Sequence, residues 1–196
     1  LAQIEGTDIR RVLGETVRFA HGTTVSTNAL IQRRGAKVGL LTTRGFDDTL
    51  FIGRGPVGRV GGLPQSRAMD FLHTEPRPPL VPKARVRSVS ERVVASGEIL
   101  APLNEEEARA ALEALLAAGT ESIAVCLLWS FRNPVHELRI RQIARAIAPG
   151  LPVSLSCEIA PRIGEYERTV TKVINAFIGP VTERYIGRLK QELGDL

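Results

Sequence analysis

The chain has 196 residues, of which 43% are hydrophobic and 24% are charged, and its formal net charge is +5. This composition is ordinary for one soluble globular domain that is long enough to bury a sizeable core. The sequence contains no apolar run of transmembrane length and no signal-peptide pattern, so we expect a cytoplasmic protein that does not bind a membrane.

The positive charge is spread along the chain in singles and in pairs such as Arg10 with Arg11, and only 5% of the residues are aromatic. Nucleic-acid binding is therefore not expected, because it would need a denser basic patch or more stacking rings. The charge favours small anionic ligands instead. Cys126 and Cys157 lie in apolar patterns typical of core residues, which argues against a disulfide or a metal site.

The most informative stretch is HGTTVSTNAL at residues 21–30. Before it, Val17 and Phe19 alternate with more polar neighbours and predict a half-buried strand. After it, an apolar pattern from Val25 predicts a helix with a cationic last turn and a stop at Gly35. The turn between them could present backbone N–H groups, hydroxyls and an imidazole to one anion, which makes it a candidate phosphate or carboxylate site.

The threonines of this turn also have a simpler interpretation. Thr23 or Thr24 is the predicted N-cap of the helix, and capping alone would account for the hydroxyl. His21 is expected as a buried neutral ring that needs a partner, and Asn28 lies one turn into the helix beside the same turn. The pattern alone leaves both interpretations open.

Repeated βα units follow this stretch. Residues 37–43 predict a mostly buried strand, and residues 47–52 predict a short helix capped by Asp47. Residues 53–83 are rich in glycine and proline, and a loop of this length is usually functional or mobile. Its GRGPVGRVGG segment is not followed by a helix with a conventional lysine, so it does not predict a phosphate loop.

The next elements continue the alternation. Residues 85–100 predict a β-hairpin. A clear helix starts at Asn104 as N-cap, with Glu107 completing a capping box and an apolar face that ends before Gly119. The apolar run 123–129 predicts a central parallel strand that is covered on both sides.

The C-terminal third predicts more of the same units. A helix starts at Asn133, with His136 in its first turn as a capping or surface residue. Residues 153–159 alternate as a less covered strand. A long helical pattern from 170 to 193 is expected to be kinked or divided at Pro180.

The start of that helical pattern carries GEYERT at residues 164–169. An acidic helix start with local ion pairs explains these charges, and a functional Glu167 or Arg168 is the alternative. Taken together, the elements predict one α/β domain over residues 1–196 with repeated βα units.

Five separated blocks of this chain, in order and spacing, resemble the N-terminal region of the hydantoinase A and oxoprolinase family, which also includes ATP-dependent ketone carboxylase subunits. The blocks are HGTTVSTNAL (21–30), GAKVGLLTTRGFDD (35–48), PLVP (79–82), LLWSFRNPVHE (127–137) and EYERTVTKVINAFIGPV (165–181). The resemblance implies an actin-like, ribonuclease-H-related α/β fold with a mixed sheet. It also implies MgATP-driven activation of a carbonyl oxygen in a lactam, a cyclic imide or a ketone, for hydrolysis or carboxylation; the substrate branch stays open.

Members of this family open with a DxGGT phosphate motif, which this chain lacks. The resemblance therefore implies that the chain is a fragment, that ATP and Mg²⁺ belong to the full-length parent, and that the isolated chain binds neither tightly and is catalytically silent. The implied partners are a small cyclic amide or ketone and a hydantoinase B-type subunit or domain. The alternative is a noncatalytic assembly module that presents residues 53–83 to a partner subunit.

The resemblance also implies site residues. Residues 22–24 would bind phosphate or a substrate oxygen, His21 would orient it or shuttle a proton, and Asn28 would brace the turn. Two arginines are candidate anion clamps and two acidic residues are candidate acids or orienting partners. The catalytic candidates are His21, Asp47 and Glu167. The binding candidates are Gly22, Thr23, Thr24, Asn28, Arg44 and Arg168.

Overall fold

The structure is a computed structural model that describes residues 6, 8–54, 64–70 and 78–194. Its contacts divide the chain into two compact units: unit 1 consists of Leu1–Gly35 and Ile178–Leu196, and unit 2 of Ala36–Phe177. Each unit is described by itself. Large parts of the predicted loop 53–83, including most of GRGPVGRVGG, lie outside the described residues.

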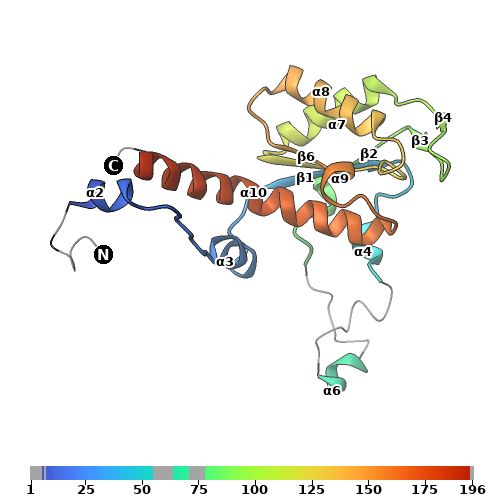
Figure 1. Cartoon of the computed structure of the whole chain (residues 1–196). Helices are drawn as coiled ribbons and strands as arrows, with labels where there is room; N and C mark the ends of the chain where they lie inside the picture. The colour runs from blue at the N-terminus through green and yellow to red at the C-terminus, as the bar shows by residue number, and fades with distance from the viewer. Residues whose placement is uncertain (1–5, 7, 55–63, 71–77, 195–196) are drawn as a thin grey trace. The chain divides into compact units, whose positions relative to one another are not determined.

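The centre of unit 2 is a four-stranded parallel sheet in the order β2-β1-β5-β6 (Figure 1). The strands are β1 (Val38–Thr43), β2 (Val86–Val89), β5 (Ser122–Cys126) and β6 (Val153–Leu155). All residues of β1 and β5 are buried, as their apolar runs predict for strands covered on both faces. The predicted central strands are confirmed, although β5 ends earlier than the apolar run does.

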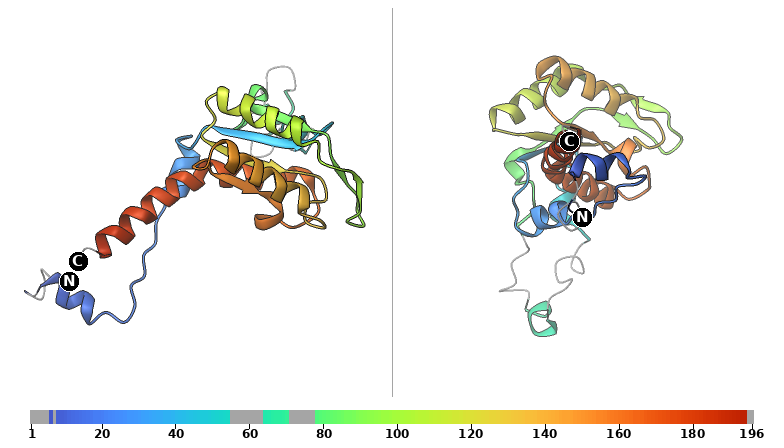
Figure 2. Two further views of the ribbon diagram at one scale, coloured as in Figure 1. Left: turned by 90° about the horizontal axis from the view of Figure 1, so that it is seen from above. Right: turned by 60° about the vertical axis from the view of Figure 1, so that its left-hand side comes forward.

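Helices cover both faces of this sheet, which confirms the predicted α/β class. Helices α7 (Glu105–Ala117) and α8 (Val135–Ile147) lie side by side over one face (Figures 1 and 2). The first part of α10 (Glu165–Gly194) covers the other face. The main core lies under α7 and α8 and includes Leu41, Leu112, Val125 and Ile140.

Asn104 caps α7 as predicted. Its side chain accepts a hydrogen bond of 3.1 Å from the N–H of Glu107. The capping box is only half formed, because the Glu107 carboxylate accepts a bond of 2.8 Å from the N–H of Ser90 instead of returning to Asn104. The capping residues therefore also fasten α7 to the segment that follows β2.

The predicted hairpin over residues 85–100 is shorter than expected. Strands β3 (Arg92–Val93) and β4 (Ile99–Ala101) form a separate antiparallel pair around Gly97, whose φ is 92°. Strand β2 joins the parallel sheet instead, because pairing with β1 lets it bury Val86 and Val89. The parallel and antiparallel pairings thus occur in separate sheets.

The predicted strand 153–159 is also wrong in its second half. Strand β6 ends at Leu155, and α9 (Ser156–Ile159) follows. The buried Glu137 carboxylate accepts bonds of 2.6 Å from the Ser156 hydroxyl and 2.9 Å from the Cys157 N–H. These bonds hold the chain in a helical turn where the alternating pattern predicts extended backbone.

Smaller elements connect these parts. The predicted helix at 47–52 begins later, as α4 (Thr49–Ile52), and the Asp47 side chain does not cap it. The Asp47 carboxylate accepts a bond of 3.2 Å from the N–H of Gly45 instead, which closes the turn after β1. The other short helices are α6 (Gln65–Ala68) and η1 (Lys83–Arg85).

Unit 1 contains α2 (Ile9–Gly14), α3 (Val25–Ile31) and the rest of α10. The strand predicted before His21 is not formed: Val17 is 100% exposed and Phe19 is 55% exposed. A strand needs a neighbouring strand to receive its backbone hydrogen bonds, and no described residue of unit 1 provides one.

Helix α3 stops earlier than predicted. It ends at Ile31 and does not continue to the predicted stop at Gly35, and Arg33 takes a left-handed conformation with a φ of 53°. The N–H of Arg34 then donates to the carbonyl of Ala29 at 2.8 Å, which closes the helix end.

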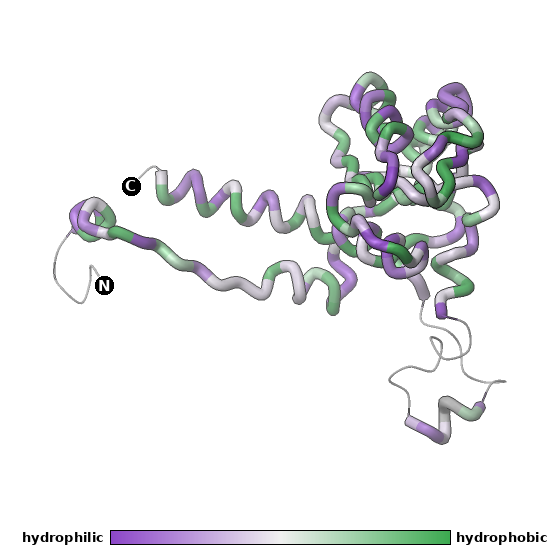
Figure 3. Tube along the Cα trace, turned by 45° about the vertical axis from the view of Figure 1, so that its right-hand side comes forward, coloured by the Kyte–Doolittle hydropathy of each residue, from purple (hydrophilic) through white to green (hydrophobic). Residues whose placement is uncertain are grey.

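Helix α10 is continuous through Pro180, so the prediction of a division there is wrong. Proline removes one intrahelical N–H donor but has a helical φ, and the turns on either side keep their own hydrogen bonds. The two units divide within this helix, between Phe177 and Ile178, close to the proline. Figure 3 shows hydrophobic and hydrophilic residues alternating along the C-terminal part of the helix, which belongs to unit 1.

Candidate functional site

The turn at residues 21–24 of unit 1 is open. All four residues are exposed, and within the described chain their backbone N–H groups donate to no protein acceptor. Thr23 accepts a bond of 3.2 Å from the N–H of Val25, so part of the capping interpretation holds. Thr24 is at the N-cap position but makes no capping bond; its hydroxyl accepts from the Asn28 amide at 3.2 Å. Within the described residues, the backbone N–H groups of the turn therefore have no protein acceptor.

His21 is exposed, contrary to the expectation of a buried ring, but it is held in place. Its Nε2 shares a hydrogen bond with the hydroxyl of Tyr185 on α10. The ring also stacks on Tyr185 with centroids 5.8 Å apart and on Phe19 with centroids 6.3 Å apart. The partner that we expected His21 to need is thus an aromatic hydroxyl.

A second bond joins the same two helices of unit 1. The Ser26 hydroxyl on α3 and the Thr182 hydroxyl on α10 are 2.7 Å apart. Thr182 also donates to the carbonyl of Ile178 at 3.0 Å. Together with the contact between His21 and Tyr185, this bond fixes the turn against α10. The sequence analysis did not find these partners, because more than 150 residues separate the members of each pair.

The other predicted site residues belong to unit 2. Arg44, just after β1, forms an ion pair of 2.9 Å with Glu107 of α7, and both side chains are partly exposed. The ion pair connects the end of β1 to the start of α7, which gives the charge of Arg44 a structural role. Hydrogen bonds from Ser90, and then the charge of Arg44, lower the pKa of the Glu107 carboxyl group.

Glu167 lies in the first turn of α10 and forms an ion pair of 2.7 Å with Arg54. Its own backbone N–H and then Arg54 lower its pKa, so the carboxylate is charged at neutral pH. A group in that state suits an orienting role better than proton donation. Glu167 lines a cavity of about 500 Å³ between residues 45–54 and 164–167.

Arg168 is buried, with only 2% of its surface exposed. Its guanidinium donates to the carbonyl of Leu127 at 3.0 Å and to the hydroxyls of Ser130 and Ser156. It lies 3.9 Å from the buried carboxylate of Glu137. These contacts connect β5, α8, α9 and α10, so the charge of Arg168 holds unit 2 together.

A buried polar cluster at the carboxyl end of the sheet was not found by the sequence analysis. The Glu91 carboxylate lies 2.8 Å from Nδ1 of His136 and accepts a bond from the Thr43 hydroxyl. Thr43 in turn accepts from the N–H of Leu128 at 3.0 Å. His136 is therefore a core residue with an acidic partner, not the expected capping or surface residue. The one sequence signal for this cluster was Glu91, an acidic residue that follows the apolar strand β2.

The described residues contain no group of three or more histidine, cysteine, aspartate or glutamate side chains that could hold a metal ion. Among the same residues, no helix is long and apolar enough to cross a membrane.

The four-stranded parallel sheet with helices on both faces defines unit 2 as an α/β fold. Residues 3–148 match the family described as the hydantoinase/oxoprolinase N-terminal region, and the chain belongs to this family.

Similar proteins support the same assignment. The chain is 37% identical over 187 residues to the acetophenone carboxylase gamma subunit of Aromatoleum aromaticum, covering 93% of the chain and 25% of that subunit. It is 38% identical over 177 residues to the caprolactamase alpha subunit of Pseudomonas jessenii, covering 89% of the chain and 24% of that subunit. The chain thus spans about a quarter of the length of these relatives.

Solved structures share the fold. The crystal structure of the ATP-dependent caprolactamase from Pseudomonas jessenii matches with a TM-score of 0.84 and 34% identity, over 98% of this chain and 27% of that one. The nucleotide-free structure of an acetone carboxylase matches with a TM-score of 0.88 and 27% identity, over 99% of this chain and 28% of that one. Both likenesses are consistent with the expected actin-like ATPase-related fold.

Proposed function

We propose that the protein activates a carbonyl oxygen of a small lactam, cyclic imide or ketone by ATP-dependent phosphorylation, so that hydrolysis or carboxylation can follow, and that this chain supplies part of the site. The observation that carries the proposal is the open turn at residues 21–24 with its free N–H groups, in a family with relatives named as ATP-dependent enzymes.

The chemistry needs such a turn. An amide or ketone oxygen is a poor leaving group, and transfer of a phosphoryl group to it produces a reactive electrophile or a trapped enol. Negative charge accumulates on oxygen during this transfer, and fixed N–H and hydroxyl donors stabilise it. We assign this role to Gly22, Thr23 and Thr24, with Asn28 bracing Thr24 through the bond of 3.2 Å.

His21 is assigned to orient the oxygen or to move a proton. The bond from its Nε2 to Tyr185 and the stacking of the two rings restrict the rotation of the imidazole. The Tyr185 hydroxyl can donate to or accept from the imidazole, so either tautomer of the ring is compatible with this contact.

The candidates of unit 2 receive positioning roles in this proposal. Arg44 and Asp47 shape the turn after β1, and Glu167 holds Arg54 beside the adjacent cavity. Arg168 supports the carboxyl end of the sheet from inside the core. ATP is proposed as the phosphoryl donor, with its phosphates at the donor-rich turn. Mg²⁺ is proposed to be bound by the full-length protein. A hydantoinase B-type subunit or domain is the proposed partner.

The test uses the full-length protein that contains this chain. His21→Ala should lower the ATP- and substrate-dependent turnover by about 10²-fold or more, the usual effect of losing a positioned acid–base group, with little change of the unfolding temperature. Tyr185→Phe, which keeps the ring stacking but removes the hydroxyl, should have a smaller effect on turnover. Equal losses of turnover and thermal stability in His21→Ala would assign His21 a structural role and contradict the proposal.

The isolated chain offers a second measurement. We expect it to release no phosphate from MgATP, because the DxGGT phosphate motif of the family is not among its residues. If the full-length protein also binds no MgATP in calorimetry but binds a partner polypeptide tightly, the chain is an assembly module instead.

A further inference from the structure

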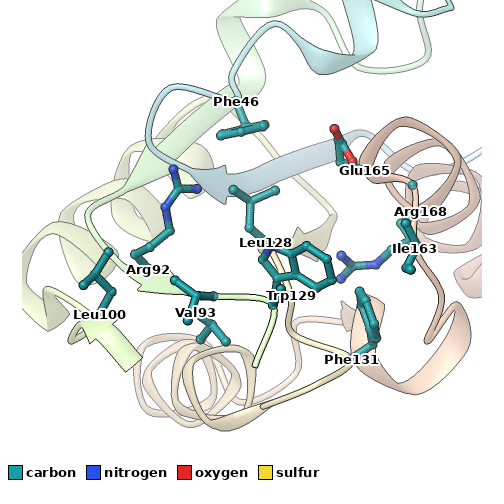
Figure 4. Close-up of a pocket in the computed structure, with 13 residues that line it drawn as sticks. Phe46, Arg92, Val93, Leu100, Leu128, Trp129, Phe131, Ile163, Glu165 and Arg168 are labelled. Atoms are coloured by element: carbon teal, nitrogen blue, oxygen red, sulfur yellow. The ribbon is translucent and has the colours of Figure 1, made fainter. Parts of the chain in front are cut away.

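A cavity of about 540 Å³ opens at the carboxyl end of the sheet of unit 2 (Figure 4). Its size falls in the range of small-molecule sites. Phe46 follows β1, and Leu128 and Trp129 follow β5, so the cavity lies where the chain leaves two neighbouring strands. From β1 the chain leads to β2 on one side, and from β5 it leads to β6 on the other. Ligands of parallel α/β proteins bind at such switch points.

One wall of the cavity is aromatic and strained. Trp129 has a φ of 53°, a left-handed conformation that is costly for a bulky side chain and that occurs preferentially at ligand sites. Its ring contacts that of Phe131 with centroids 5.5 Å apart. The guanidinium of the buried Arg168 lies over the Phe131 ring, 5.2 Å from its centre. The structure thus holds a flat apolar surface in one position, which suits stacking with a ligand ring.

The rim of the cavity is apolar and largely uncovered. Leu100 is 71% exposed and Ile163 is 72% exposed, and Figure 4 shows them at opposite ends of the cavity. Exposed apolar side chains of this size around a concave site mark a binding surface, because removing them from water lowers the free energy when an apolar molecule covers them.

A positively charged residue in the cavity indicates that the bound molecule carries an anionic group. Arg92 lines the cavity with its guanidinium 5.6 Å from the centre of the Phe46 ring. Within the described part of the chain it forms no ion pair, so its donors remain available to an anion. Glu165 is an acidic residue of the wall, and Figure 4 shows it well away from Arg92.

We propose that this cavity binds a small aromatic carboxylate, with the ring against Trp129 and the carboxylate against Arg92. The site is built from unit 2 alone. It requires neither ATP nor the turn at residues 21–24, so it can be tested separately from the proposed function.

Trp129 is the one tryptophan of the chain, so its fluorescence reports directly on the cavity. Benzoate should change this fluorescence saturably, whereas acetate, which has no ring, and benzyl alcohol, which has no charge, should bind at least about tenfold more weakly. Arg92→Gln should weaken benzoate binding by about tenfold, the effect of one charge-assisted hydrogen bond, and leave benzyl alcohol unaffected. A benzoate response that does not saturate, or that is equal for acetate or unchanged in Arg92→Gln, would overturn the proposal.

A matched pair of variants separates a charge placed at the cavity rim from a charge placed elsewhere on the surface. Ile163→Asp places a negative charge at the rim and should abolish benzoate binding. Ile31→Asp changes a residue of unit 1 that is 75% exposed and should have no effect. Circular dichroism and thermal unfolding check that both variants are folded. If Ile163→Asp instead changes the oligomeric state and benzoate still binds, a second copy of the chain covers the rim and the assignment of the cavity to a carboxylate is wrong.

Discussion

His21 before α3 and Tyr185 on α10 share a hydrogen bond across 164 residues of sequence. The imidazole is otherwise exposed, so this bond and the stacking of the rings determine its direction. The contact makes Tyr185 a positioning residue for His21, and this role can be measured.

Tyr185→Phe should lower kcat in the full-length protein and leave KM nearly unchanged. Loss of the hydroxyl leaves the ring of His21 stacked but removes the partner of Nε2, so the imidazole is oriented less well for the reaction while substrate binding is kept. Because the bond is exposed, the free energy of unfolding should fall by less than about 1 kcal/mol. Steady-state kinetics and urea unfolding check the two effects. An unchanged kcat with a large loss of stability would show that Tyr185 acts only in packing.

Glu137→Ala should strongly destabilise the chain. The fully buried Glu137 carboxylate accepts bonds from Leu127, Ser156 and Cys157 and lies near Arg168. Removing one member of a buried ion pair typically costs about 3–5 kcal/mol, because the other charge is left without compensation. Urea unfolding measures this loss.

The double variant Glu137→Ala/Arg168→Met is the control. It removes both buried charges, so it should recover part of the stability lost in Glu137→Ala. Additive losses from the two substitutions would contradict a coupled pair.

Lys172→Met should stabilise the protein at neutral pH. Lys172 is fully buried, and its Nζ has no hydrogen-bond partner among the described residues. Burial lowers its pKa from the ordinary lysine value of 10.5, although Glu137 acts in the opposite direction. The unfolded chain then binds more protons than the folded chain between the two pKa values, so stability should rise as the pH increases through that interval.

Thermal unfolding between neutral and alkaline pH tests whether the stability rises with pH. The rise with pH should be absent in Lys172→Met and retained in Lys190→Met, which changes an exposed lysine of the same helix. A lower unfolding temperature for Lys172→Met at neutral pH would show that the charge is compensated in the core.

Neither cysteine should react with a thiol reagent near neutral pH in the folded chain. Burial raises the pKa of the Cys126 thiol, and burial together with Glu137 raises that of Cys157 to about 12. The thiolate is the reactive species, so alkylation should be slow until denaturant exposes both thiols. Rapid labelling of either residue without denaturant would show that the core opens locally.

The sequence by itself determined the elements whose patterns are local. The apolar runs of β1 and β5 require burial on both faces, and the cap at Asn104 needs only residues three positions apart. The α/β class follows from these elements, and the five family blocks add the link to the hydantoinase/oxoprolinase family.

Only the tertiary structure decided the features that depend on distant partners. The alternation before His21 describes an apolar face, but a strand forms only where another strand accepts its hydrogen bonds. Ser156 and Cys157 turn into α9 because Glu137, from α8, holds them. His136 is buried because Glu91 lies opposite it, 45 residues away in sequence. Hydrophobic periodicity encodes which side of an element is buried, whereas pairing between buried polar groups depends on the position of the whole chain in space, and no local pattern carries that information.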